Sequence, residues 1–94
     1  MHFLYIIHSK SVNKYYVGET TNVENRLILH KEGRFRRAFT KIAKDWEIVL
    51  KFECADRSEA LFLESFIKRM KSKKFIEKII DTPKILAEIL SKHR

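Results

Sequence analysis

FLYIIHSKSVNKYYVGE, residues 3–19, is the stretch that predicts the fold of this chain. Phe3–Ile7 is apolar at every position, which is typical of a short strand that is covered on both faces and is central in its sheet. We interpret Lys14–Glu19 as its hairpin partner, joined through a polar loop. Alternate residues of a strand share a face, so a suitable register puts the phenols of Tyr5 and Tyr16 on one side.

A helix, a second helix and a strand are predicted to follow the hairpin. Thr21 and Glu24 have the spacing of a capping box, which begins a helix that runs to about Lys31 and that Gly33 ends. Apolar residues then recur at helical spacing and predict a short second helix: Phe35, Phe39 and Ile42. The next apolar residues alternate with polar ones and predict a strand with one buried face: Ile48, Leu50, Phe52 and Cys54.

The last 40 or so residues are predicted to be helical, and this is enough chain for roughly three to four helices of average length. Asp56 with Glu59 repeats the capping signal and opens a helix to about Lys71, with a buried stripe of Ala60, Leu63, Ile67 and Met70. A second stripe follows, made of Phe75, Ile76, Ile79 and Ile80. Thr82 and Pro83 then form an N-cap and a first helical position for a last helix, which carries Ile85, Leu86, Ile89 and Leu90.

These elements predict an α+β fold, with a three-stranded antiparallel sheet around a central N-terminal strand and helices beside it. A chain of 94 residues is too short for two hydrophobic cores, and its two glycines and one proline leave little room for linkers. We therefore predict a single domain over 1–94, with a core of about 2–80 and an extra C-terminal helix over 82–92.

The composition points to a phosphate-rich partner. Twenty Lys and Arg residues against twelve Asp and Glu residues leave a formal charge of +8, which is typical of proteins that bind nucleic acid or an anionic surface. A solvated basic surface is the simpler alternative. The apolar run at the N-terminus is too short for a membrane span, and the single cysteine suits a reducing compartment, so we expect a cytoplasmic protein without a membrane partner.

Candidate site residues gather in the first third of the chain. Arg26 and His30 lie four apart on a predicted helix, which places them on one face, and Gly18 permits close approach of a phosphate to the backbone. With Tyr5 and Tyr16 they would form a polar concavity above the sheet. Simpler roles exist for each: amphipathic strand tyrosines, a surface arginine, and a histidine that complements a helix dipole.

This set resembles the GIY-YIG nucleases, in particular the small standalone members related to the nuclease domain of bacterial excision repair. Phe3–Tyr5 stands in the place of the first motif and Tyr16–Gly18 in the place of the second. Arg26 and His30 follow on the next helix, and Glu64 lies on the later one. The resemblance covers most of the chain, and it implies a nuclease with DNA repair among its possible pathways.

The resemblance implies that water hydrolyses a phosphodiester with the help of one divalent cation, Mg²⁺ or Mn²⁺. Glu64 would bind the metal and Arg26 would hold the scissile phosphate. Tyr5 would be the general base, with Tyr16 and His30 orienting water and phosphate or assisting proton transfer. Because a free phenol has a pKa of about 10, Tyr5 requires nearby cations to lower its pKa.

Basic residues on either side of this set are predicted to grip the backbone of a nucleic acid. They form two clusters: Arg34, Arg36, Arg37, Lys41 and Lys44, and then Lys68, Lys71, Lys73 and Lys74. Contacts of this kind give affinity without sequence preference. We therefore expect cleavage with little sequence specificity, of DNA rather than RNA.

Two further functions remain open. Many members of the family carry an asparagine after the glutamate, whereas all three asparagines here precede Glu64, which is consistent with a non-catalytic nucleic-acid-binding domain. Glu64 then has a simple partner in Lys68, one helical turn away. A protein-interaction module, or a homodimer, would instead use the apolar face of the final helix, around Ile85, Ile89 and Leu90.

Overall fold

The computed structural model describes residues 1–32 and 42–93. Its elements in chain order are β1 (His2–Ser9), β2 (Lys14–Thr20), α1 (Val23–Lys31), β3 (Trp46–Cys54), α2 (Arg57–Met70), α3 (Lys73–Asp81) and α4 (Lys84–His93). The expected Gly33 cap and most of the short helix over 35–42 lie outside the described residues. None of the helices in the described ranges is long and apolar enough to cross a membrane.

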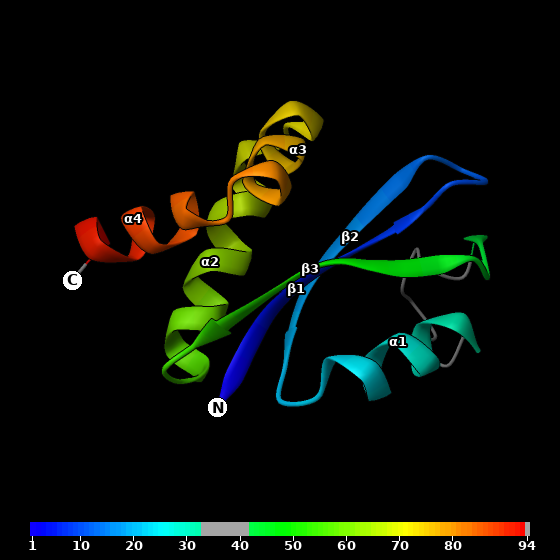
Figure 1. Ribbon diagram of the computed structural model, residues 1–94, viewed down its shortest axis with the longest axis horizontal. Helices are drawn as coiled ribbons and strands as arrows, with labels where there is room; N and C mark the ends of the chain where they lie inside the picture. Colours follow the sequence, from blue (N-terminus) through cyan, green and yellow to red (C-terminus); the bar gives the residue numbers. More distant parts are fainter. Residues whose placement is uncertain (33–41, 94) are drawn as a thin grey trace.

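The three strands form one antiparallel sheet in the order β2-β1-β3, which confirms the α+β prediction with a central N-terminal strand. Figure 1 shows α1 on one side of the sheet and α2, α3 and α4 on the other. The hairpin register pairs Tyr5 with Gly18 and Ile7 with Tyr16. Both phenols therefore lie on the α1 side, as the alternation of a strand requires.

An extra residue in β3 changes which side chains share a face. Ile6 pairs with Leu50 but Ile7 pairs with Ile48, so Val49 has no partner of its own on β1. Such a bulge reverses the alternation of the strand. The prediction of one buried face through β3 is therefore wrong, because Ile48 packs on the α1 side while Val49 and Leu50 pack on the α2 side.

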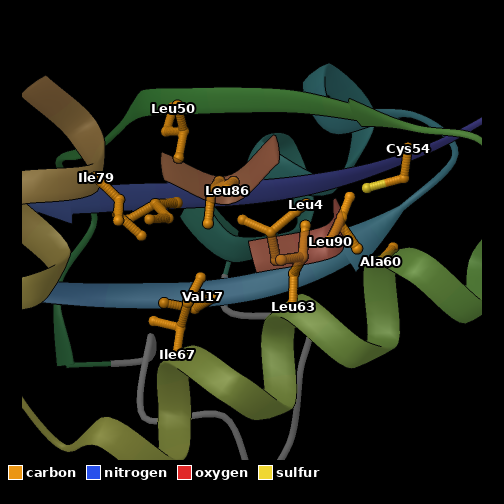
Figure 2. Close-up of a cluster of buried hydrophobic side chains, with 11 residues drawn as sticks. Leu4, Val17, Leu50, Cys54, Ala60, Leu63, Ile67, Ile79, Leu86 and Leu90 are labelled. Carbon is orange, nitrogen blue, oxygen red and sulfur yellow. The ribbon is translucent and has the colours of Figure 1, made fainter. Parts of the chain in front are cut away.

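The larger hydrophobic core lies between the sheet and α2–α4 (Figure 2). Leu4 and Val17 from the sheet meet Leu63 and Ile67 from α2, which confirms most of the predicted stripe. Met70 is the exception, at 48% exposure. The stripe stops short because α2 ends at this residue, and α3 continues the core in its place.

The helix starts follow the predicted signals with one shift. Asn22, not Thr21, caps α1, and its Oδ1 accepts a hydrogen bond from the backbone N–H of Asn25 at 2.9 Å. Glu24 does not complete a capping box, because its carboxylate pairs with Lys51 on β3 at 3.2 Å. An Asn at N-cap is as favourable as Thr or better, so the shift follows the local chemistry.

The cap of α2 is the one predicted, with Asp56 Oδ1 accepting from the N–H of Glu59 at 2.9 Å. The last helix begins at Lys84, one residue later than predicted, so Pro83 precedes the helix, and Thr82 is the C-cap of α3. Its Leu86 and Leu90 are buried in the same core as the sheet residues. The single-domain boundary over 1–94 stays a prediction that this packing supports.

The apolar face of α4 was expected to serve an interaction partner. Ile85, Ile89 and Leu90 instead pack against the core of their own chain. A homodimer or an interaction module built on that face therefore loses the exposed surface that it needs.

Candidate active site

Three predicted side chains meet on the α1 side of the sheet. The hydroxyl of Tyr5, on β1, lies 2.8 Å from Nε2 of His30, on α1. The ring of Tyr16, on β2, lies 4.7 Å from that of His30 and 6.3 Å from that of Tyr5, measured between centroids. Tyr5 and His30 are each 1% exposed, so the hydrogen bond between them is shielded from water.

Gly18 makes room for this cluster. A Cβ atom at this position would lie 2.6 Å from the hydroxyl oxygen of Tyr5 and 2.7 Å from its Cζ, closer than side chains can approach. Because the phenol of Tyr5 packs over this position, a glycine is required there. Its predicted contact with a phosphate is not tested by the structure.

The protonation states of the buried pair follow from its surroundings. Burial raises the pKa of Tyr5 well above its usual value, and neighbouring Tyr16 adds to this, while Arg26 opposes it. Burial, assisted by Arg26, lowers the pKa of His30 to about 4. At neutral pH the pair therefore consists of a protonated phenol and a neutral imidazole. This is the opposite of the lowered pKa that a general-base role for Tyr5 requires.

Arg26 and Glu64 act on the same phenol from different elements. Arg26 lies one turn before His30 on α1, and its charge lowers the pKa of both Tyr5 and His30. Glu64, on α2, raises the pKa of Tyr5 from the other side of the sheet. Because β2 is an edge strand, residues from both faces can meet around its open edge. Tyr5, Tyr16 and His30 pack together, while the charges of Arg26, on α1, and Glu64, on α2, act on the pKa of Tyr5.

Lys68 links the two sides of the site. Its Nζ lies 2.7 Å from Oε2 of Glu64 and 5.5 Å from the centroid of the Tyr16 ring. The prediction of a Glu64–Lys68 pair is confirmed. The same ammonium group also contacts a tyrosine of the first cluster, so the pair belongs to the site and not to a remote surface.

The sequence comparisons agree with this geometry. A family model described as the GIY-YIG catalytic domain matches residues 1–78. The chain belongs to the GIY-YIG family. Among curated proteins, it is similar to the UPF0213 proteins of Yersinia pestis (strain Pestoides F) and of Yersinia pseudotuberculosis serotype O:3 (strain YPIII). Each is 33% identical over 88 residues, which cover 92% of this chain and 88% of the relative. No solved structure matches.

GIY-YIG nucleases generally use divalent metals, and the carboxylates of this chain limit which metal it can hold. Within the two described ranges, no group of three or more His, Cys, Asp or Glu side chains lies together. Glu64 offers a single carboxylate, and Lys68 engages its Oε2. Magnesium is typically held by one or two carboxylates with waters and substrate phosphates, so Glu64 suits such a site and not a closed zinc site.

The structure describes residues of the second predicted basic cluster but few of the first. Lys68 and Lys71 are exposed, at the C-terminal end of α2 beside Glu64. Arg34, Arg36, Arg37 and Lys41 lie outside the residues that the structure describes. A role in nucleic-acid binding stays a prediction for all of them.

Sequence reasoning missed a polar contact that closes the far end of the hairpin. Asp45, just before β3, accepts hydrogen bonds from the hydroxyl of Ser9 and from the N–H of Ser11. These bonds, led by that of Ser9, lower the pKa of Asp45 to about 2. The aspartate and serines are 34 or more residues apart, so no local pattern could have joined them.

Proposed function

We propose that this protein is a metal-dependent endonuclease that hydrolyses phosphodiester bonds of DNA with little sequence specificity. The observation that carries the proposal is the packing of Tyr5, His30 and Tyr16 on the α1 side of the sheet, with the charges of Arg26 and Glu64 acting on Tyr5, in a chain of the GIY-YIG family. A phosphate bound there would meet a guanidinium on one side of β2 and a carboxylate on the other.

Arg26 binds the scissile phosphate and stabilises the charge that develops on it during attack. Glu64 would hold a Mg²⁺ or Mn²⁺ ion, which would supply further positive charge beside the phosphate. Lys68 would then have to leave Glu64 Oε2, and its ammonium group would be available to the phosphate. Its exposed stem permits this movement, because a surface pair at this spacing is worth only about 0.2–0.5 kcal/mol.

The proton-handling roles differ from those first expected. The raised pKa of Tyr5 and its near-complete burial suit a positioning group and not a base. We assign Tyr5 and His30 to holding Tyr16 in place through the contacts between their rings. Tyr16 is half-buried and the Nζ of Lys68 lies 5.5 Å from its ring centroid, so we assign its hydroxyl, in place of that of Tyr5, to orienting the attacking water.

Low sequence specificity is supported by the exposed lysines that surround Glu64, which suit backbone phosphates and carry no base information. The net charge of +8 favours a polyanionic substrate. DNA in preference to RNA follows from the resemblance alone.

The test is a nicking assay on supercoiled plasmid and branched DNA with magnesium, manganese or EDTA. We expect metal-dependent nicking that falls at least about 100-fold in Glu64→Ala and in Arg26→Ala. Glu47→Ala is the matched control, since Glu47 is an exposed carboxylate on β3, at the other edge of the sheet, and should leave the rate unchanged.

The second candidate is a non-catalytic nucleic-acid-binding domain, which the absence of an asparagine after Glu64 favours. It predicts binding with a steep dependence on salt and no nicking on any substrate or with any metal. Nicking that survives in EDTA, or that Glu64→Ala leaves intact, would contradict the endonuclease.

A further inference from the structure

A cavity of about 440 Å³ opens beside the site, between β2 and the junction of α2 and α3. We call it the β2–α3 cavity. Its apolar wall consists of Val17, Ile67 and Ile76, and Tyr15 and Tyr16 line it from β2. The volume lies within the range of pockets that hold small ligands. The function proposed above gives this cavity no role.

The cavity is strongly basic. Four of its lining residues are lysines, namely Lys14, Lys68, Lys71 and Lys73. None of the described residues that line it carries a carboxylate. The nearest acidic groups are occupied, since Glu64 pairs with Lys68 and Glu77 approaches the Tyr15 hydroxyl at 3.5 Å. An apolar wall with a ring of lysines fits a ligand that combines a flat apolar group with phosphate.

Tyr15 supplies a rigid aromatic surface. Its ring packs against that of His8 in a tilted contact, with 4.5 Å between centroids and 38° between planes, and the Nζ of Lys73 lies 5.9 Å from its centroid. The same ammonium donates a hydrogen bond to the carbonyl of Asn13 at 3.2 Å. Lys73 is exposed, so a base that stacks on Tyr15 has only a flexible ammonium group to displace. Aromatic rings beside basic grooves are how proteins commonly hold unpaired bases.

The β2–α3 cavity lies next to a second hollow that contains the candidate catalytic carboxylate. This hollow, of about 540 Å³, contains Glu64 and shares Lys68 and Lys71 with the cavity. A nucleic-acid strand whose phosphate lies at Glu64 can therefore pass along these two lysines and reach Tyr15.

We propose that the β2–α3 cavity binds one unpaired nucleotide of the substrate strand, next to the phosphate that is cut. Its base packs against Tyr15 and the apolar wall, and Lys71 and Lys73 bind the adjoining phosphates. A base inside a duplex is already stacked and paired and cannot enter. The proposal rests on the proposed nuclease function and narrows its substrate to DNA that is single-stranded at the cut.

The test measures binding without cleavage, with the full chain in EDTA. A single strand that carries 2-aminopurine is compared with a blunt duplex of equal length at one salt concentration. Electrostatics alone favours the duplex, which has twice the phosphates. We expect the single strand to bind at least about fivefold more tightly, with a change in 2-aminopurine fluorescence as the base stacks.

Lys73→Ala and Lys74→Ala form a matched pair, because both lysines are exposed in the first turn of α3 and only Lys73 lines the cavity. Lys73→Ala should weaken single-strand binding at least about threefold more than Lys74→Ala, since it alone removes a cavity contact. Tyr15→Leu keeps the apolar volume and should abolish the fluorescence change. If Tyr15→Leu does not fold, the exposed lysine pair still decides the question.

Equal or tighter binding of the duplex, equal effects of the two lysine variants, or no binding of either DNA would overturn the proposal. Failure of the nuclease function gives a different result. Single-strand preference that depends on Lys73, without nicking in magnesium or manganese, would retain the cavity and reject the endonuclease.

Discussion

The two faces of the sheet bury different kinds of side chain. The core under α2–α4 is built from apolar groups such as Leu4, Leu63 and Leu86. The face under α1 buries a phenol and an imidazole beside Ile7 and Trp46. The first face contributes hydrophobic stability, in proportion to the apolar area removed from water. The second face can bury polar groups with little loss of stability, because Tyr5 and His30 are hydrogen-bonded to each other.

Neighbouring residues on α2 give the strongest way to separate the two functions. Leu63 is fully buried in the apolar core, whereas Glu64 points to the site. We expect Leu63→Ala to lower the free energy of unfolding by about 2–5 kcal/mol. Glu64→Ala should change it by less than about 0.5 kcal/mol. Urea denaturation followed by circular dichroism measures both, and equal losses would contradict the division between the faces.

The polar face should make stability depend on pH. The pKa of His30 is lowered to about 4 in the folded protein, so the unfolded chain takes up this proton first as the pH falls. The free energy of unfolding should therefore keep its highest value above the unfolded-state pKa of about 6.5. It should fall by about 2–3 kcal/mol as the pH drops to 4. Denaturation in urea at several pH values measures this slope.

His30→Gln should remove most of that slope, while His8→Gln, in the hairpin, should keep it. A wild-type protein whose stability stays constant between pH 7 and pH 4 would show that His30 is not held neutral by its surroundings.

Gly18 tests how tightly the polar cluster is packed. Gly18→Ala places a methyl group 2.6 Å from the Tyr5 hydroxyl, and the buried ring has no free space to move into. We expect a loss of about 1–3 kcal/mol in the free energy of unfolding, together with a lower nicking rate. The same substitution in a Tyr5→Leu background should cost less, because the clashing atoms are gone. Additive losses in this double-mutant cycle would refute the contact.

Much of the candidate site was predictable because it depends on local spacing. The four-residue interval between Arg26 and His30 sets one helical face, and the hairpin sets the side on which Tyr5 and Tyr16 lie. The bulge at Val49 was not predictable, because a strand with apolar residues on both sides of an extra residue shows no break in its pattern. The place of Ile48 followed from that bulge.

Other features depended on contacts between distant segments. The β2–α3 cavity unites Tyr15 with Lys73, and the rest of β2 together with α1, β3 and α2 lies between them in the sequence. A general-base role for Tyr5 required nearby cations to lower its pKa, and the sequence could not show their distances. Burial proved to be the larger influence, since desolvation of a phenolate outweighs the attraction of one arginine.

The sequence by itself determined which segments are strands and which are helices. It also determined that the N-terminal strand is central in the sheet, and which residues could act on a phosphate. These follow from periodicity, capping and motif spacing, which are properties of neighbouring residues. Only the tertiary structure decided that Tyr5 keeps its proton, that Gly18 accommodates a phenol, and that the charges of Glu64 and Arg26 both act on Tyr5. Burial and electrostatic fields depend on what surrounds a group in space, and that is set when the elements pack.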